Sequence, residues 1–393
     1  MHAKILLNKP RRDNPRLFHP WIYRSQIREV AGQAAPGDLV DVFSEGRPLG
    51  VGYYNPASEI TVRLLARSAE PVDKAFFVHK IKKALAFRQR FVKDTNAIRV
   101  ISSEADGLPG LILDRYDETL VVQFLTLGME RLRLPVLDAI REVLPSSRGI
   151  YERSDSASRK IEGLESKTGW IEKSCGDEVT VFEKDVRYTV RFGEGHKTGF
   201  YLDQRENRFL FRELGMKGEV LDAFCYEGGF GLHLAASGCR VLGIDIQEEV
   251  IRRAKENRTL NGLGEDRLQL LTGNVFDELK KFEKESRRFD FVILDPPSFV
   301  KKKAALEGAF AGYKEILLRS MKILNPGGFL AIFSCSYHVD ENLLMQASLG
   351  AAADTHRSLR VLKFLKQAAD HPIDPFIPES YYLKGFLFEV FPS

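Results

Sequence analysis

The chain has 393 residues, 44% hydrophobic and 28% charged, so it is long enough for two or three domains with cores of their own. No apolar run approaches the ~18 residues of a membrane-spanning helix, and the basic start leads into no signal-peptide core, so we expect a soluble, cytoplasmic protein. The four cysteines lack CxxC spacing and give neither a disulfide framework nor a zinc cage.

The net charge of +4 is small but unevenly distributed. Residues 1–93 contain 17 Lys and Arg against 8 Asp and Glu, whereas the other 300 residues contain 41 against 46. A basic N-terminal part is typical of a polyanion-binding surface, although ordinary solvated lysines explain the same pattern.

The first elements read as a β-rich module followed by a helix. From Leu39 to Leu65, apolar stretches alternate with turn residues, including Glu45 to Pro48 and Tyr54 to Pro56. After Pro71, helical spacing places one set of residues on an apolar face, namely Phe77, Ile81, Ala84, Leu85 and Arg88. The opposite face carries Lys74, Lys80, Lys82 and Lys83, which would track a phosphate backbone or simply face solvent.

The middle and C-terminal parts of the chain differ in their predicted pattern of strands and helices. Strand-like runs at 111–113 and 119–125, a helical run at 130–143 and a hairpin pattern at 179–192 predict a small α+β domain. From about Gly195, short apolar strands alternate with helices, which predicts a doubly wound α/β sheet. We therefore expect three domains at 1–70, 71–193 and 194–393.

A nucleotide-type site is indicated by the strand Val220 to Phe224, a glycine-rich turn reaching Gly231, and a helix beginning near Leu232. The next strand, from Val241, ends in Asp245, an acid placed to bind both ribose hydroxyls. The turn is not G-x-G-x-x-G, and Asp222 lies inside the strand, where it would repel a diphosphate. That acid suits the cationic sulfonium or amino group of S-adenosylmethionine, so a nicotinamide dehydrogenase is a distant alternative.

Two further strands complete the predicted donor site. Leu268 to Leu271 leads to Asn274, whose amide suits the adenine edge or a plain turn, with Val275 and Phe276 placed to pack on the ring. Phe289 to Leu294 leads into Asp295-Pro296-Pro297, a rigid rim suited to methyl transfer onto a nitrogen heterocycle. From the strands and turns, the expected donor-site residues are Asp222, Phe224, Tyr226, Gly228, Gly229, Asp245, Ile246, Asn274, Val275 and Asp295.

Cys335 is the expected nucleophile. A helix at 313–324 and a turn at 325–328 precede the strand Phe329 to Phe333, after which Cys335 stands between two serines, next to the strand that ends at Asp295. A thiolate added to C6 of a pyrimidine makes C5 reactive toward a methyl group, and Asp295 would stabilise the charge at N3 or O2. His338 is only a weak candidate for the base that removes the C5 proton.

At these residues the chain resembles the PUA-domain-containing cytosine-5 methyltransferases that act on bacterial 23S (large-subunit) ribosomal RNA. The matching segments run in order along nearly the whole chain: His19 to Tyr23, Ser103 to Leu111, Lys197 to Arg205, Asp222 to Gly231, Asp295 to Phe299, Ser334 to Ser336 and Pro378 to Phe386.

The resemblance implies a PUA fold for residues 1–70, a Rossmann-like class I methyltransferase domain, RNA as partner and S-adenosyl-L-methionine as cofactor. It also implies that Lys197 to Arg205 closes over the donor, which adds Tyr201, Gln204 and Arg205 to the donor site, and that homodimers can form. Two departures stand out: no cysteine follows Asp295-Pro296-Pro297, unlike in the better-known cytosine-5 enzymes, and Asn274 stands where an Asp is often found.

Two other functions remain open. Exocyclic-amine methylation uses an aromatic directly after the Asp-Pro-Pro run, where this chain has Ser298 and then Phe299. An RNA-binding or ribosome-assembly factor with a non-catalytic methyltransferase fold would not need the acids Asp222, Asp245 and Asp295.

Overall fold

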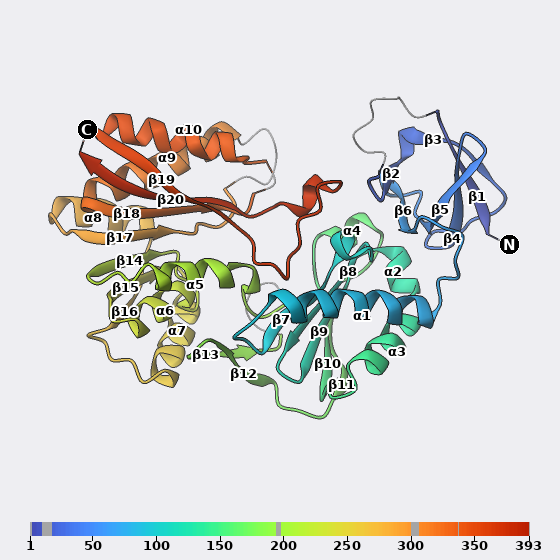
Figure 1. Cartoon of the computed structure of the whole chain (residues 1–393), viewed down its shortest axis with the longest axis horizontal. Coiled ribbons are helices and arrows are strands. Elements are labelled where there is room, and N and C mark those ends of the chain that lie inside the picture. Colours follow the sequence, from blue (N-terminus) through green and yellow to red (C-terminus); the bar gives the residue numbers. More distant parts are fainter. Residues whose placement is uncertain (1, 10–17, 194–197, 300–305, 337, 393) are drawn as a thin grey trace. The chain divides into compact units, whose positions relative to one another are not determined.

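The computed structural model describes residues 2–9, 18–193, 198–299, 306–336 and 338–392 (Figure 1). It separates into two compact units. The first comprises Met1–Glu183, Thr189–Leu202 and Ala369–Ser380, and the second Lys184–Tyr188, Asp203–Ala368 and Tyr381–Ser393. Each unit is built from discontinuous segments, and the domain boundaries at 70 and 193 stay predictions.

The first unit begins with the predicted β-rich module, a six-stranded sheet of order β2-β6-β5-β4-β1-β3. Its strands are β1 Ala3–Leu7, β2 Trp21–Tyr23, β3 Ile27–Ala31, β4 Leu39–Ser44, β5 Arg47–Tyr54 and β6 Ile60–Ala66, with a 3-10 turn η1 Arg24–Gln26. Glu45 and Gly46 both have positive φ in the β4–β5 turn, as a tight hairpin requires. The apolar alternation of β4 buries Val40 and Val42, which confirms the predicted module.

The same unit contains a five-stranded sheet of order β11-β10-β9-β8-β7. Its strands are β7 Ala97–Ser102, β8 Leu111–Tyr116, β9 Thr119–Phe124, β10 Gly149–Ser154 and β11 Lys167–Lys173. Its helices are α1 Lys74–Phe91, α2 Leu127–Arg131, α3 Arg133–Val143, α4 Ser158–Ile161 and the 3-10 turn η2 Ser103–Asp106. A two-stranded sheet, β12 Glu178–Glu183 with β13 Val186–Arg191, is the predicted hairpin.

Two helices of the first unit can be compared with the helices expected from the sequence. The helix expected over 130–143 is interrupted at Leu132. Pro135 explains the break, because a proline has no N–H to donate and its ring clashes with the carbonyl four residues earlier. In α1 the predicted apolar face is buried at Phe77, Ile81 and Ala84, which confirms the helical spacing.

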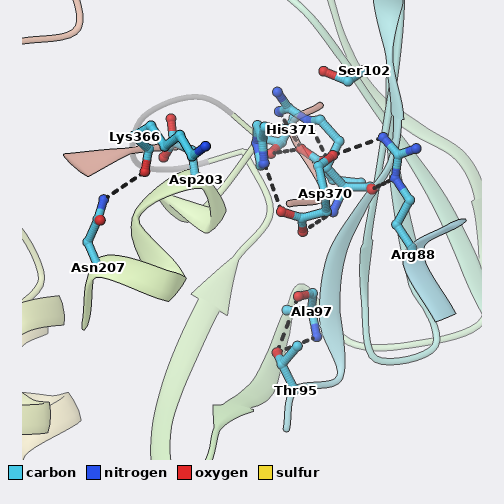
Figure 2. A network of polar contacts seen from close by, with 12 residues as sticks. Arg88, Thr95, Ala97, Ser102, Asp203, Asn207, Lys366, Asp370 and His371 are labelled. Carbon is cyan, nitrogen blue, oxygen red and sulfur yellow. Dashed lines mark hydrogen bonds and ion pairs between the residues drawn. The ribbon is translucent and has the colours of Figure 1, made fainter. Parts of the chain in front are cut away.

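A buried ion pair ties the segment Ala369–Ser380 to the rest of the first unit. The guanidinium of Arg88 donates to both carboxylate oxygens of Asp106, at 2.6 and 2.7 Å, and to the carbonyl of Asp370 at 2.9 Å (Figure 2). Asp370 in turn accepts from the backbone N–H of Arg99 at 3.0 Å and contacts His371 at 2.9 Å. These bonds hold a C-terminal segment, including η5 Pro378–Ser380, beside α1 and β7.

The second unit is a seven-stranded sheet of order β16-β15-β14-β17-β18-β20-β19 with helices on both faces (Figure 1). Its strands are β14 Glu219–Ala223, β15 Arg240–Asp245, β16 Leu268–Thr272, β17 Phe289–Leu294, β18 Leu324–Ser334, β19 Arg357–Lys366 and β20 Lys384–Pro392. Its helices are α5 Arg205–Glu213, α6 Gly229–Ala236, α7 Glu248–Leu260, α8 Val275–Lys284, α9 Leu306–Ile323 and α10 Glu341–Asp354; η3 Leu202–Gln204 precedes α5 at the boundary between the units.

The predicted Rossmann-like, doubly wound sheet is confirmed, with β20 antiparallel to both neighbours. Strand β14 is the central switch point, because the chain winds outward from it to β15 and β16 on one side and to β17 and β18 on the other. Two helices start earlier than expected: α6 at Gly229 rather than near Leu232, and α9 at Leu306 rather than Tyr313.

Candidate active site

The glycine-rich turn after β14 has an unusual backbone. Phe224, Tyr226 and Gly228 have φ of 65°, 50° and 84°, so three of five consecutive residues are left-handed and two of them are not glycine. Such residues each cost about 1–3 kcal/mol and cluster at functional sites. The turn is held in place by backbone bonds from Cys225 to Ile244 at 2.8 Å and from Gly228 to Cys225 at 2.9 Å.

Asp222 is the acid at the centre of this turn, and it is only 1% exposed. Its Oδ2 accepts from the N–H of Gly231 at 2.8 Å, which satisfies one of the free N–H groups in the first turn of α6. A side chain at Gly231 would be crowded, because a Cβ there would lie 3.2 Å from Oδ2. The other oxygen, Oδ1, is buried and receives no hydrogen bond from any residue that the structure describes.

Burial raises the pKa of Asp222 to about 7. The charges of Asp295 and Asp245 add to that rise, while the Gly231 amide and Arg208 oppose it. A buried carboxylate with one oxygen unsatisfied is costly unless a cation or donor reaches it. The residue is therefore chemically suited to the cationic methionine end of S-adenosylmethionine, and this role stays a prediction.

The ends of β15 and β16 lie beside β14, where the adenosine was expected to bind. Asp245 accepts from the N–H groups of Tyr226 and Gln247, each at 3.1 Å, so its carboxylate is oriented by the turn. Ile246 is 66% exposed, an apolar side chain open to a flat ring. Asn274 caps α8 through its Oδ1, at 2.9 Å from the N of Phe276, which leaves its NH₂ group for the adenine edge. Val275 is buried in the core.

Asp295 follows β17, the neighbour of β14 on the other side. Its Oδ2 accepts from the Gln204 side-chain amide at 3.0 Å. The amide of Asn207 donates to Gln204 Oε1 at 2.6 Å and to the carbonyl of Lys366 at 3.0 Å (Figure 2). The structure thus brings the predicted Gln204 onto the predicted Asp295, and it adds Asn207, which lies three residues further along and which the sequence analysis missed.

The segment Lys197 to Arg205, which we expected to close over the donor, is divided between the two units. Arg205 begins α5 and is 1% exposed, whereas Tyr201 belongs to the first unit, so its role stays a prediction. In that unit the Thr198 hydroxyl donates to Asp114 at 2.5 Å and contacts Tyr116 at 2.8 Å. Lys197 lies outside the described residues.

Cys335 follows β18, which pairs in parallel with β17 so that Leu294 is opposite Ile332. The two strands therefore deliver Asp295 and Cys335 to the same edge of the sheet. Cys335 is exposed, while Cys225 and Cys239 are buried and Cys175 is half-buried. The hydroxyl of Tyr313 donates to Ser334 at 2.9 Å, and burial, together with the charges of Cys335 and Asp295, raises the pKa of Tyr313. Tyr313 is thus within electrostatic reach of both predicted catalytic groups.

Lys384 is a further residue of this edge to which the sequence analysis gave no role. It stands opposite Ser334 in the β18–β20 pair and is 7% exposed, with its Nζ 5.5 Å from the centre of the Tyr381 ring. Burial lowers its pKa, and the charges of Asp340, Glu341 and Cys335 oppose that change. An ammonium group therefore lies within electrostatic reach of the Cys335 thiol. His338, the weak candidate for a base, is half-buried.

Comparison with known proteins agrees with this geometry. Residues 158–389 match the family described as S-adenosylmethionine-dependent methyltransferase, and residues 5–67 match a PUA-like domain. Two solved structures share the fold, a SAM-dependent methyltransferase from Streptococcus mutans and a methyltransferase complexed with SAH. Each is 19% identical, with a TM-score of 0.83 over 98% of this chain and 99% of theirs.

The fold and site thus define a S-adenosylmethionine-dependent methyltransferase with an N-terminal PUA-like domain, and the cofactor is S-adenosylmethionine. A protein of Alteromonas mediterranea is 40% identical over 99% of both chains, and one of Vibrio cholerae is 39% identical over 99% of this chain and all of its own. Both are named ribosomal RNA large subunit methyltransferase I, and the chain belongs to their family. No helix in the described ranges is long and apolar enough to cross a membrane.

Proposed function

We propose that the protein methylates C5 of a cytosine in large-subunit ribosomal RNA through a covalent adduct with Cys335. The observation that carries this proposal is the exposed thiol of Cys335 at the same sheet edge as Asp295. The names of the relatives supply the class of substrate. The domain division at 70 and 193, the cytoplasmic location and the homodimer stay predictions beside it.

The donor site assigned to this function follows the strand ends. Asp222 faces the methionine amine and sulfonium, Asp245 the ribose, and Ile246 with Asn274 the adenine. The backbone around Phe224, Tyr226, Gly228, Gly229 and Val275 shapes the site, and Gln204 and Arg205 at the start of α5 cover it. The bound donor supplies an electrophilic methyl group.

The residues of the chain carry the other steps. The Cys335 thiolate forms a bond to C6, and the displaced electron pair moves through the ring to N3, where Asp295 delivers or shares a proton. The resulting C5 carbon is the nucleophile that takes up the methyl group. Loss of the C5 proton to a base then restores the C5–C6 double bond and releases the thiolate, and the proton at N3 returns to Asp295. Lys384 stabilises the free thiolate before and after this sequence.

One contact disfavours methylation of an exocyclic amine. That chemistry needs an aromatic ring beside the Asp-Pro-Pro run to clamp the base. The Phe299 ring packs against Tyr313, with ring centres 4.9 Å apart, and against Phe276 at 6.2 Å. The ring is thus already packed edge-to-face and tilted against the chain's own aromatic residues.

The test incubates the protein with labelled donor and RNA that carries 5-fluorocytosine, which blocks loss of the C5 substituent. We expect a covalent, denaturant-stable complex with the wild type and none with Cys335→Ala. Cys175→Ala is the matched control, since its thiol is half-buried and lies outside the site. Full methylation by Cys335→Ala would contradict the mechanism, and donor binding without any RNA methylation would contradict the function.

A further inference from the structure

Helix α1 in the first unit has an unusual charge pattern. Its 18 residues include six Lys and Arg and no Asp or Glu. Lys74 is paired with Glu142 at 2.7 Å, and Arg88 is buried against Asp106. Among the residues that the structure describes, Lys80 and Lys83 form no ion pair, so these two cations on α1 are available to an outside anion.

Lys80 and Lys83 line a groove of about 630 Å³ that lies entirely within the first unit. The other walls come from the end of β6, from η2 and from the segment around Pro372 and Ile377. The Lys80 side chain lies over Gly107. A Cβ added to Gly107 would be only 2.9 Å from the Nζ of Lys80. Burial lowers the pKa of Lys80, and the charge of Glu70 opposes that change. The Nζ of Lys80 lies 5.3 Å from the centre of the Phe76 ring.

Aromatic rings stand in and beside the same groove. Phe18 and Phe87 line it, although they are 52% and 38% exposed. The Phe18 ring lies 5.0 Å from that of Phe376, and the Arg67 guanidinium lies 5.4 Å from its centre. Exposed phenylalanines next to unpaired cations are the features of a surface that stacks nucleobases and binds phosphates.

The acids of the groove accept hydrogen bonds from the chain itself, and only Asp106 is paired with a cation among the described residues. Asp106 is neutralised by Arg88. Glu104 accepts from the indole N–H of Trp21 at 2.9 Å, and Asp374 accepts from the backbone N–H of Phe376 at 2.9 Å. Glu70, the remaining acid, bonds to Ser68 at 2.9 Å.

We propose that this groove binds a single-stranded segment of the RNA substrate, with bases stacked on Phe87 and Phe18 and phosphates held by Lys80 and Lys83. The inference rests on the proposed function, since it assumes that the substrate is RNA. A single strand fits better than a duplex, because only unpaired bases expose the faces that phenylalanine stacks on. The groove would thereby bind nucleotides of the substrate other than the reacting base.

The test measures binding of a fluorescein-labelled 12-nucleotide single-stranded RNA by anisotropy from 50 to 300 mM salt. Lys80→Gln/Lys83→Gln is compared with Lys82→Gln/Lys93→Gln, which removes the same charge from exposed positions on and just after α1 outside the groove. We expect the salt slope to fall by about 1.4 for the groove pair, at about 0.7 per lost phosphate contact, and less for the control. Phe87→Ala should weaken binding about 5- to 150-fold. Phe182→Ala is the matched control, because that ring is also exposed and lies outside the lining, and it should weaken binding much less.

Methylation of ribosomal RNA by the same variants separates the two proposals. If the wild type binds and methylates RNA but the groove and control variants behave alike, the groove proposal is overturned and the function stands. If the wild type binds the donor but neither binds nor methylates RNA, the proposed function itself fails. Circular dichroism and donor affinity, both expected to be unchanged, show that each variant is folded.

Discussion

Replacing Asp222 with Asn should stabilise the donor-free protein at alkaline pH while weakening donor binding. The carboxyl is buried, accepts one backbone bond from Gly231 and has a pKa raised to about 7, so above that pH the folded protein must hold an uncompensated charge. An amide keeps the bond from Gly231 and removes the charge. It also removes the group that attracts the cationic end of the donor.

The sign and the size of the expected change in unfolding free energy follow from the coupling between proton binding and folding. The folded pKa is raised above the ordinary 3.8, so the proton stabilises the folded state fully below 3.8, and that stabilisation is lost as the pH rises through about 7. Between pH 8.5 and 5.5 the wild type should therefore gain about 2 kcal/mol of unfolding free energy that Asp222→Asn does not gain, at about 1.36 kcal/mol per pH unit below the pKa. The donor prefers the ionised acid, so its affinity for the wild type should fall as the pH drops below 7.

The assay is chemical unfolding of the donor-free protein at pH 5.5, 7 and 8.5, with donor affinity measured by calorimetry at pH 6, 7 and 8. Asp277→Asn is the matched control, because that acid is exposed on α8. Parallel pH profiles of unfolding for the wild type and Asp222→Asn, or a wild-type donor affinity that is flat from pH 6 to 8, would refute the reasoning.

Two other substitutions test neighbouring parts of the structure. Lys384→Gln should slow alkylation of Cys335 by iodoacetamide at pH 7.5 about 3- to 10-fold, because a nearby cation favours the reactive thiolate, and Lys384→Arg should restore the rate; equal rates would remove Lys384 from the site. Arg88→Met should lower the unfolding free energy by about 3–5 kcal/mol, because it leaves Asp106 buried without its cation, and Arg88→Met/Asp106→Leu should recover much of that loss. Urea unfolding measures this effect, and a loss below about 1 kcal/mol contradicts it.

The fold of the second unit could be read from the sequence because buried parallel strands are continuous apolar runs. Phe289 to Leu294 is one such run, and it forms β17 with the predicted bounds. The ends of helices could not be predicted where they depend on the local backbone or on a single contact. The start of α6 at Gly229 follows the left-handed Gly228, and the gap at Leu132 depends on where a proline ring meets the preceding turn.

The acids of the candidate site were predictable for a similar reason. Residues at the carboxyl ends of neighbouring parallel strands must meet, so Asp222, Asp245 and Asp295 could be grouped before their positions were known. Asn207 and Lys384 were missed because their relation to the site comes from tertiary contacts alone. The bond from Arg88 to Asp370 joins residues 282 positions apart, a pairing that no local pattern in the sequence indicates.

Two kinds of unfavourable feature lie close together in and before the turn that follows β14, and their surroundings explain how they persist. Phe224 and Tyr226 are left-handed, and Asp222 is a buried acid with one oxygen unsatisfied. The strand before the turn, from Val220 to Ala223, is fully buried and paired on both sides, to β15 and to β17. Because that central strand fixes the turn at its start, local relaxation is possible only by disrupting the core of the sheet. The strained turn is therefore held ready for the donor, whose binding would satisfy the acid without rebuilding the backbone.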